Sequence, residues 1–595
     1  MTKTKNLLKH FRTSMHISWK ASPWMFLSRI LFELVSISIP ILSSYIFKEI
    51  IDNLSYARDM DLFIRNIALF AILQFASMIY GRVSGHIAGV HSELVSRYIR
   101  LEIIEKINEL DLSYFDIPDF YNEIQNASRD SKSLLSLTWT IVSIVKGIVQ
   151  SIVCGIILAQ MLWVFPFVIL AMDIPGVMIA RVLNRKKYDW QLRRTDQERR
   201  IGYYESVMQG RAFAKDVRIW DSKPFFMKKY LALWKDWFCE KNKIERERIG
   251  LTLISSTFPF LVNIMMLVYI GIEVIGGRLT IGDFTYYRSI SSQYRSGLEM
   301  FLSTINDSYD SEMRLSHYAD FLSWKSRVPD EGILEVNRIN TVEFRNVSFS
   351  YPNTNREVLH NLSFRIDENE KLAVVGYNGA GKTTLIKLLL RLYDPVSGDI
   401  LINGRNIKEY TLKSLRNNFS TVFQDYNRYE LPVDETVALA DTKNPIDKGR
   451  VIRACLNANL DVTKPEDYPK TTDTYLGKLF DKEGVILSGG QWQKVAIAQA
   501  YYKRGNFMIM DEPNASLDPK SEHIMFEKLK ELSQDRSGLI VTHRLSSVFM
   551  ADRILVINSG HKEAIGTHTE LMQQCEIYRN LFNMQAEHYR KESRI

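Results

Sequence analysis

A glycine-rich segment carries the clearest chemistry in the sequence. Within KLAVVGYNGAGKTTLIKLLLRLY (residues 371–393), the pattern G-x-x-x-x-G-K-[ST] is matched by Gly376, Tyr377, Asn378, Gly379, Ala380, Gly381, Lys382 and Thr383. Glycines allow backbone N–H groups to close around phosphate oxygens, the ammonium of Lys382 neutralises β- and γ-phosphates, and the Thr383 hydroxyl is a ligand for Mg²⁺. Because a strand-like run precedes the motif and a helix-like run follows it, the segment predicts a site for a nucleoside triphosphate and Mg²⁺.

Two adjacent carboxylates end a second apolar run. Residues 507–510 read as a buried strand, and Asp511 and Glu512 follow directly. Beside a phosphate-binding loop, Asp511 is placed to hold the magnesium shell and Glu512 to polarise the water that attacks the γ-phosphate. The plainer interpretation is a solvated strand end. The glycine-rich loop in the same chain favours the catalytic interpretation.

A serine and two glycines stand before another helix-like pattern. The stretch VILSGGQWQKVAIAQA contains Leu487, Ser488, Gly489, Gly490 and Gln491 in this position. A turn would account for the glycines alone. An anion bound by backbone N–H groups at a helix N-terminus would account for the serine as well.

The order of these motifs resembles that of the ATP-binding domain of ABC transporters. The motifs stand, in chain order, at Gly376–Thr383, Gln424, Leu487–Gln491, Asp511-Glu512, Ser516-Leu517-Asp518 and His543. In that family, the segment matching Ser488–Gln491 binds the γ-phosphate of ATP held on the glycine-rich loop of the other subunit. The resemblance therefore implies a homodimer with two head-to-tail ATP-binding domains, both of whose sites hydrolyse ATP.

The resemblance also implies roles for residues outside these patterns. Tyr351 corresponds to the aromatic residue that stacks on adenine, and Thr384 extends the phosphate-binding loop. Gln424 corresponds to a Mg²⁺ ligand that also senses the membrane domain. Asp518 belongs to the loop that links the two sites, and His543 corresponds to the γ-phosphate sensor. ATP and Mg²⁺ are the implied cofactors.

The first half of the chain holds long uncharged apolar runs, which indicate a membrane domain. A helix that spans a bilayer needs about 20 mostly apolar residues. Six segments are candidates: Trp24–Phe47, Asn66–Gly81, Leu134–Ala159, Met161–Ala180, Gly250–Ile272 and Phe284–Ile305. The turn between the third and fourth spans is expected within residues 160–166.

Basic segments predict which side of the membrane each connection occupies. Residues 82–132 and 181–248 are long and polar, and the second is dense in Lys and Arg, so both are expected in the cytoplasm. They read as helical hairpins that continue beyond the bilayer. The stretches 116–130 and 214–230 within them resemble the positions of exporter coupling helices. Residues 1–23 are basic and predict an amphipathic helix on the inner membrane surface.

Together these elements predict a multi-pass, multidomain protein of the cytoplasmic membrane. An all-α six-span domain with long cytoplasmic extensions covers residues 24–325, a linker 326–340, and an α/β P-loop ATPase domain 341–595. The whole chain thus resembles an ABC exporter half-transporter. Its net charge of +8 is modest and dispersed, which argues against a nucleic-acid partner. The four cysteines are scattered without a CxxC pair, so we expect neither disulfides nor a zinc site.

The most polar candidate span, the sixth, indicates where a cargo could pass. Helical spacing places Arg288, Arg295 and Glu299 on one face, and Ser292 is a further candidate for the path. A charge that faces lipid costs on the order of 3 kcal/mol, so this face is expected to line a water-filled cavity. Asp173 in the fourth span is a second candidate for the path. The alternative is that Arg295 and Glu299 pair across one turn and only support packing.

The cargo is indicated only by resemblance. The stretches FQDYNRYELPVDETVAL and LSGGQWQKVAIAQA look most similar to exporters of ribosomally made, modified peptides such as lantibiotics. Residues 1–23 are too few for a peptidase domain, so a separate leader peptidase or maturation enzymes are expected partners. A multidrug or lipid exporter of the same architecture is the alternative. A soluble ABC ATPase of repair or translation is disfavoured by the six spans.

Overall fold

The computed structural model describes residues 2–354, 356–512, 527–531, 533, 536–542 and 548–592. The chain forms two compact units. The first comprises Met1–Ile107 and Asn122–Trp324, and the second comprises Asn108–Tyr121 and Lys325–Ile595. The short segment Asn108–Tyr121 therefore packs with the second unit, although the helices on either side of it belong mainly to the first.

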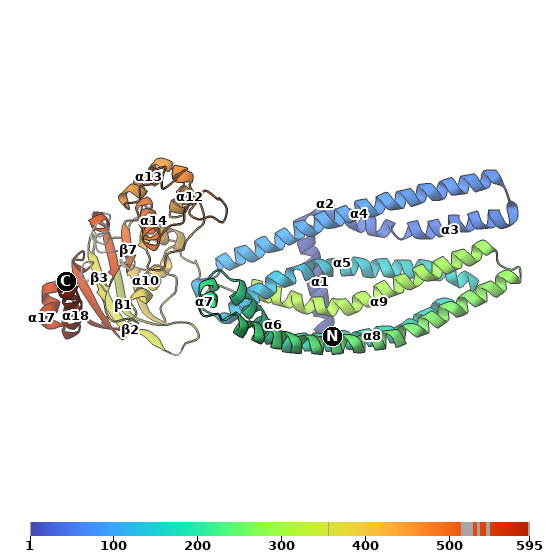
Figure 1. Cartoon of the computed structure of the whole chain (residues 1–595), viewed down its shortest axis with the longest axis horizontal. Coiled ribbons are helices and arrows are strands. Elements are labelled where there is room, and N and C mark those ends of the chain that lie inside the picture. Colours follow the sequence, from blue (N-terminus) through green and yellow to red (C-terminus); the bar gives the residue numbers. More distant parts are fainter. Residues whose placement is uncertain are drawn as a thin grey trace. The chain divides into compact units, whose positions relative to one another are not determined.

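The first unit is built from helices, and its long helices lie side by side (Figure 1). Their bounds are α1 Thr2–Ala21, α2 Pro23–Val35, α3 Ser38–Asp52, α4 Met60–Glu109, α5 Pro118–Met161, α6 Phe165–Gln209, α7 Ala214–Ile219, α8 Lys223–Ile275 and α9 Ile281–Ser323. A π-helical turn, Asn53–Ala57, follows α3. Residues 1–23, predicted as one helix, contain α1 and the start of α2.

Five helices within the described residues are long and apolar enough to cross a membrane. They are Pro23–Ala57, Met60–Glu109, Val142–Met161, Phe165–Lys187 and Lys223–Ile275. The sixth predicted span lies within α9, which is helical throughout but is not one of these five. The predicted first span lies within Pro23–Ala57, where Ser36 and Ile37 stand between α2 and α3 and keep right-handed helical backbone angles. The turn expected within residues 160–166 lies between Met161 and Phe165.

Two helix pairs extend well beyond their apolar segments, as the sequence predicts. α4 continues to Glu109 before α5 returns, and α6 continues to Gln209 before α8 returns. Along the second pair, the indole of Trp190 donates to Glu240 over 2.9 Å, and Lys186 pairs with Glu247 at 2.5 Å. The stretch 116–130 is mostly part of α5, so the connection itself is shorter and lies at residues 110–117. Proline at the first helical position explains this early start of α5.

The second unit contains two sheets. An antiparallel sheet has the order β2-β1-β4-β5, with β1 Val342–Ser350, β2 Glu357–Ile366, β4 Ser397–Ile402 and β5 Arg405–Asn406. A six-stranded sheet has the order β10-β9-β3-β8-β7-β6. Its strands are β3 Lys371–Val375, β6 Phe419–Val422, β7 Phe507–Asp511, β8 Ser537–Val541, β9 Arg553–Asn558 and β10 His561–Gly566. β10 pairs antiparallel with β9, and the other pairs are parallel.

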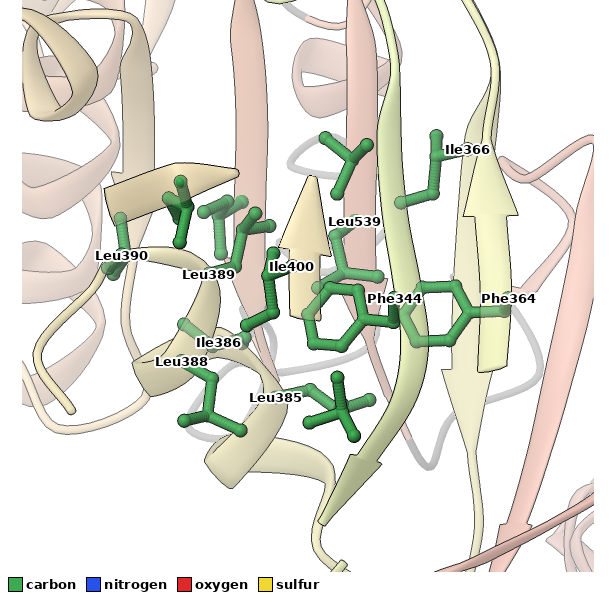
Figure 2. Packing of buried hydrophobic residues seen from close by; sticks show 14 of the residues in the cluster. Phe344, Phe364, Ile366, Leu385, Ile386, Leu388, Leu389, Leu390, Ile400 and Leu539 are labelled. Atoms are coloured by element: carbon green, nitrogen blue, oxygen red, sulfur yellow. The ribbon is translucent and has the colours of Figure 1, made fainter. Parts of the chain in front are cut away.

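Helices of the second unit pack on these sheets. Those with described bounds are α10 Lys382–Leu389, α11 Leu412–Asn417, α12 Val433–Ala438, α13 Lys448–Asn457, α14 Gly489–Tyr502, α17 His568–Gln574 and α18 Glu576–Glu592. The core that holds α10 is apolar (Figure 2): Leu385, Leu388 and Leu389 are fully buried, and Phe344 stacks on Phe364 with ring centroids 4.6 Å apart. Burial of each leucine contributes about 2 kcal/mol, so the helix after the glycine-rich loop is firmly placed.

Candidate functional site

The glycine-rich loop joins β3 to α10, and its glycines are required by geometry. Gly379 and Gly381 have φ values of 80° and 100°, in the left-handed region that favours glycine. A Cβ on Gly381 would lie 2.6 Å from Cδ2 of Leu359. Any larger residue at this position would therefore both strain the backbone and displace the packing beneath the loop.

Lys382 begins α10 and is buried. Its Nζ donates to the carbonyl oxygens of Gly376 at 2.9 Å and Tyr377 at 3.2 Å. Burial lowers the pKa of Lys382, while the nearby carboxylates of Glu512 and Asp511 act in the opposite direction. The loop thus holds a cation against its own backbone, next to two acidic groups.

A cavity of about 480 Å³ opens in front of this loop. Its lining residues come from the end of β1, from β2, the glycine-rich loop, α10 and the ends of two strands of the six-stranded sheet: Tyr351, Val358, Asn378, Gly379, Gly381, Lys382, Thr383, Thr384, Gln424 and Glu512. All of these except Val358 are residues that the sequence assigned to an ATP site. Gly376, Tyr377 and Ala380 belong to the same loop but do not line the cavity.

Asp511 ends β7 and is 3 % exposed. Its Oδ1 accepts no hydrogen bond from the described part of the chain. Burial raises the pKa of Asp511 to about 6, although hydrogen bonding to Thr383 and the charge of Lys382 lower it. A buried carboxylate oxygen without a donor, beside a threonine hydroxyl, fits a divalent cation that accepts oxygen ligands. Thr383, Asp511 and Gln424 are the residues that would hold it.

Glu512 has an unusual backbone. Its φ is 45°, left-handed for a residue with a side chain, and its N–H donates to the carbonyl of Val541 over 2.9 Å. Such a conformation costs on the order of 1 kcal/mol and is found preferentially at functional sites. Here it turns the chain at the end of β7, where Glu512 lines the cavity.

The segment Ser488–Gln491 begins α14 and is built as a helix N-terminus. The Ser488 hydroxyl accepts from the N–H of Gln491 at 3.3 Å, and the Gln491 side chain accepts from the N–H of Ser488 at 2.9 Å. The hydroxyl of Tyr426 donates to the carbonyl of Gly489 over 2.8 Å. Ser488 is exposed, and neither Gly490 nor its neighbours line the cavity around Lys382. His543 and Asp518 lie outside the described residues.

Two residues near the cavity were missed by the sequence reasoning. The Nζ of Lys387 lies 5.0 Å from the ring centroid of Tyr351 and 5.7 Å from that of Tyr393. Lys387 stands four residues after Thr383 on α10, so helical spacing alone would have placed both on one face. No local signal identifies Tyr393.

The candidate path residues of the first unit share an exposed face of α9. Arg288, Ser292 and Glu299 are exposed, and Arg295 lies between two carboxylates. Its Nε is 3.2 Å from Glu299 Oε1 and 3.8 Å from Asp173 Oδ1 on α6. Asp173 is 8 % exposed. The ion pair between Arg295 and Glu299, which the sequence offered as the alternative, is therefore present. Arg295 also links α9 to Asp173 on α6.

Comparisons with known proteins agree with both units. Residues 26–298 match the family model for the ABC transporter transmembrane region, and residues 359–515 match the ABC transporter model. The subtilin transport ATP-binding protein of Bacillus subtilis is 29% identical over 94% of this chain and 91% of its own length. The nisin transport ATP-binding protein of Lactococcus lactis subsp. lactis is 26% identical over 93% and 92%.

Relatives with other printed activities also match over most of the chain. An ATP-dependent lipid A-core flippase of Xanthomonas axonopodis pv. citri (strain 306) is 28% identical over 85% of both chains. The solved structure of a bacterial Atm1-family ABC exporter with ATP bound has a TM-score of 0.78 at 22% identity, and the match covers 95% of this chain and 98% of that one, which shows the fold.

The ATPase domain binds ATP with Mg²⁺ as its partner ion, and hydrolysis is coupled to transport. The chain belongs to the ABC transporters and is a multi-pass exporter of the cytoplasmic membrane, with transmembrane region and ATPase domain fused.

Proposed function

We propose that the chain exports a modified peptide of the antimicrobial type across the cytoplasmic membrane, as a homodimer that alternates between inward and outward access. The observation that carries this proposal is similarity over nearly the whole chain to the transport proteins of subtilin and nisin. The proposed domain limits are those of the sequence: membrane domain 24–325, linker 326–340 and ATPase domain 341–595.

The proposed dimer is supported by two separate parts of an ATP site within one chain, the cavity around Lys382 and the segment at Ser488. The cavity around Lys382 lacks a contribution from Ser488, whose exposed hydroxyl stands at the start of α14. A helix N-terminus with glycine N–H groups and a serine hydroxyl suits a phosphate. Each site is thus proposed to combine the glycine-rich loop of one subunit with the Ser488 segment of the other.

Within such a site the roles follow from the chemistry of the side chains. Lys382 and the loop N–H groups bind the phosphates, and Tyr351 stacks on the base. When bound, Mg²⁺ neutralises charge on the phosphate oxygens. Glu512 orients a water toward the γ-phosphorus and takes its proton as ADP leaves. His543 is proposed as the γ-phosphate sensor and Asp518 as part of the link between sites.

The proposed cargo path is the exposed face of α9 with Arg288, Ser292, Arg295 and Glu299. Asp173 adds a second carboxylate beside Arg295. A face with both charge signs suits a cargo with charged side chains and amide groups better than a purely apolar one. If so, Arg288→Ala should impair transport while basal ATPase activity persists.

Transport into proteoliposomes tests the cargo class. We expect nisin, as the probe, to stimulate ATP hydrolysis and to be taken up by inside-out vesicles, with Glu512→Gln protein as the matched control. A lipid exporter is the second candidate, because the lipid A-core flippase is also similar. Movement of a fluorescent phospholipid, with no response to nisin, would favour that candidate.

A further inference from the structure

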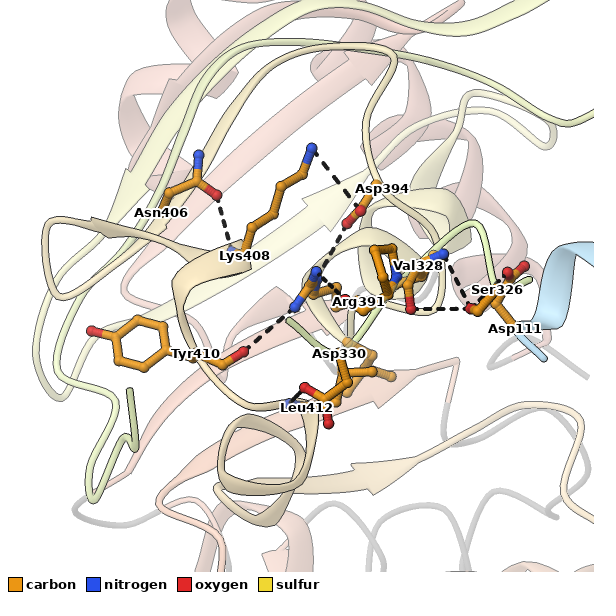
Figure 3. Close-up of polar contacts among 12 residues, drawn as sticks. Asp111, Ser326, Val328, Asp330, Arg391, Asp394, Asn406, Lys408, Tyr410 and Leu412 are labelled. Carbon is orange, nitrogen blue, oxygen red and sulfur yellow. Dashed lines mark hydrogen bonds and ion pairs between the residues drawn. The ribbon is translucent and has the colours of Figure 1, made fainter. Parts of the chain in front are cut away.

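The connection between α4 and α5 is attached to the start of the second unit. Asp111 accepts hydrogen bonds from the N–H of Ser113 at 2.9 Å and the hydroxyl of Ser326 at 3.0 Å, and also from the N–H of Arg327. Figure 3 shows Asp111 next to Ser326. The hydroxyl of Tyr114 donates to the carbonyl of Lys325 over 2.8 Å. Residues 110–117 are thereby held within the ATP-binding unit by directional contacts.

Arg391 fixes the chain that follows α10. It is 2 % exposed and donates to the carbonyls of Pro329 at 2.9 Å and Tyr410 at 3.4 Å, and it pairs with Asp394 at 3.3 Å (Figure 3). A buried guanidinium with these partners holds the end of α10 against the segment that starts at Lys325. The backbone next to Tyr393 therefore has little freedom.

Tyr393 itself contacts the connection. Its ring is 3 % exposed, and its hydroxyl donates to the Oδ2 carboxylate oxygen of Asp116, which lies in an exposed position. Burial raises the pKa of Tyr393, and the hydrogen bond to Asp116 raises it further, so the phenol remains a donor. This contact joins residues that are 277 positions apart in the chain.

The ring of Tyr393 also packs against that of Tyr351, which lines the ATP cavity. The two rings meet edge to face, with centroids 5.5 Å apart and an interplanar angle of 86°. The hydroxyl of Tyr351 lies 3.1 Å from that of Thr384, and the ammonium of Lys387 lies over both rings. Contact is therefore continuous from the cavity wall through Tyr351 and Tyr393 to Asp116.

We propose that Tyr393 is a positioning residue through which adenine bound on Tyr351 orders the α4–α5 connection at Asp116. The proposal rests on the proposed role of Tyr351 in the ATP site. Occupation of the base position restricts the Tyr351 ring, which restricts Tyr393 and favours one geometry of its hydrogen bond. The connection continues covalently into α4 and α5. Ordering of the connection by bound adenine therefore restricts the adjoining ends of these two helices.

Hydrogen–deuterium exchange on the full-length dimer in lipid nanodiscs tests this. The protein carries Glu512→Gln so that ATP is retained, and exchange in residues 110–117 is compared with and without Mg²⁺-ATP. We expect ATP to slow exchange there about fivefold or more in the parent protein. Tyr393→Phe keeps the ring against Tyr351 but removes the donor. ATP affinity should then stay within about twofold, while the ATP-dependent slowing is lost.

Matched variants separate this role from a structural one. Asp116→Ala removes the acceptor at an exposed position and should abolish the slowing, whereas Asp116→Asn, whose amide oxygen still accepts, should restore most of it. Tyr410→Phe is the control, because that hydroxyl donates to Ile402 within the same unit over 3.2 Å and does not reach the connection. It should leave the slowing intact.

Two results would have different meanings. Full ATP-dependent slowing in both Tyr393→Phe and Asp116→Ala overturns the proposal, even if ATP binds normally. Unchanged ATP affinity in Tyr351→Ala would instead show that Tyr351 does not stack on the base. That result overturns the role on which the proposal rests, while leaving ATP-driven export itself intact.

Discussion

The ammonium of Lys382 donates a hydrogen bond to the carbonyl oxygen of Gly376 over 2.9 Å, which holds the cation of the glycine-rich loop against its own backbone. Lys382→Ala removes this cation from the cavity wall. We expect ATP affinity to fall about 10- to 100-fold, since a hydrogen bond to a charged group contributes about 1.5–3 kcal/mol. Calorimetric titration with ATP measures this. Lys408→Ala, on an exposed side chain, is the control, and equal affinities in the two variants would contradict the assignment.

Glu512 stands at the cavity wall with a strained backbone. If it takes the proton of the attacking water, Glu512→Gln keeps ATP binding but lowers turnover about 10²- to 10⁴-fold. Steady-state phosphate release measures the effect. Glu531→Gln, which changes a surface carboxylate paired with Lys528, should leave turnover unchanged. Turnover near the parent level in Glu512→Gln would refute the catalytic role.

The proposed composite site predicts complementation between two inactive variants. Ser488→Arg blocks the helix N-terminus sterically and by charge, and Lys382→Ala disables the glycine-rich loop. A mixed dimer keeps one intact site, because the intact loop of one chain meets the intact serine segment of the other. Random mixing should restore about a quarter of the parent number of sites. ATPase assays on co-expressed chains check this, and a mixture as inactive as either variant alone would contradict it.

The link between Asp173 and Arg295 predicts coupled effects. Removing Arg295 alone leaves the buried Asp173 carboxylate without its nearest cation, whereas the double change removes both charges and should destabilise the protein less. We therefore expect Arg295→Ala to lower the melting temperature in detergent more than the double variant with Asp173→Asn does. Additive losses would show that the two side chains act separately. Nisin transport by Asp173→Asn across pH 6–8, if unchanged, would remove Asp173 from the proposed path.

Asp111 predicts a pH dependence of stability. Burial by itself would raise the pKa of this carboxyl, but hydrogen bonds from Ser113, Arg327 and Ser326 hold it below its ordinary value of 3.8. A lowered pKa in the folded state gives stability that is complete above the ordinary pKa and is lost as the pH falls through the folded one. The melting temperatures of the parent and Asp111→Ala proteins should differ by a constant amount above about pH 5 and converge as the pH falls below 3.8 and through the lowered pKa. A difference that persists at acidic pH would contradict this origin.

The glycine-rich loop could be predicted from sequence because one run of residues sets both its backbone and its chemistry. Gly381 needs φ near 100°, and the neighbouring Lys382 supplies the charge. Tyr351 and Gln424 carry no such local signal and were placed by resemblance, which the shared cavity supports. The apolar spans were readable from composition, but the boundary between α2 and α3 at Ser36 was not, since its neighbours are equally apolar.

Other features depend on tertiary contacts that no local pattern encodes. The hydrogen bond between Tyr393 and Asp116 joins distant parts of the chain, so neither residue's type or neighbours identifies it. The link between Asp173 and Arg295 depends in the same way on how α6 and α9 pack. Hydrophobic periodicity predicts that each helix exists but does not determine which side chains of two helices meet.

The position of residues 108–121 within the second unit also constrains the order of events during synthesis. Asp116 leaves the ribosome 277 residues before Tyr393, so the connection has no partner while the membrane helices are being inserted. Because domains fold largely as they emerge, the hydrogen bond between Tyr393 and Asp116 can form only after much of the second unit has been synthesised. Residues 108–121 are therefore made together with the membrane helices but acquire their contact with Tyr393 only later in synthesis.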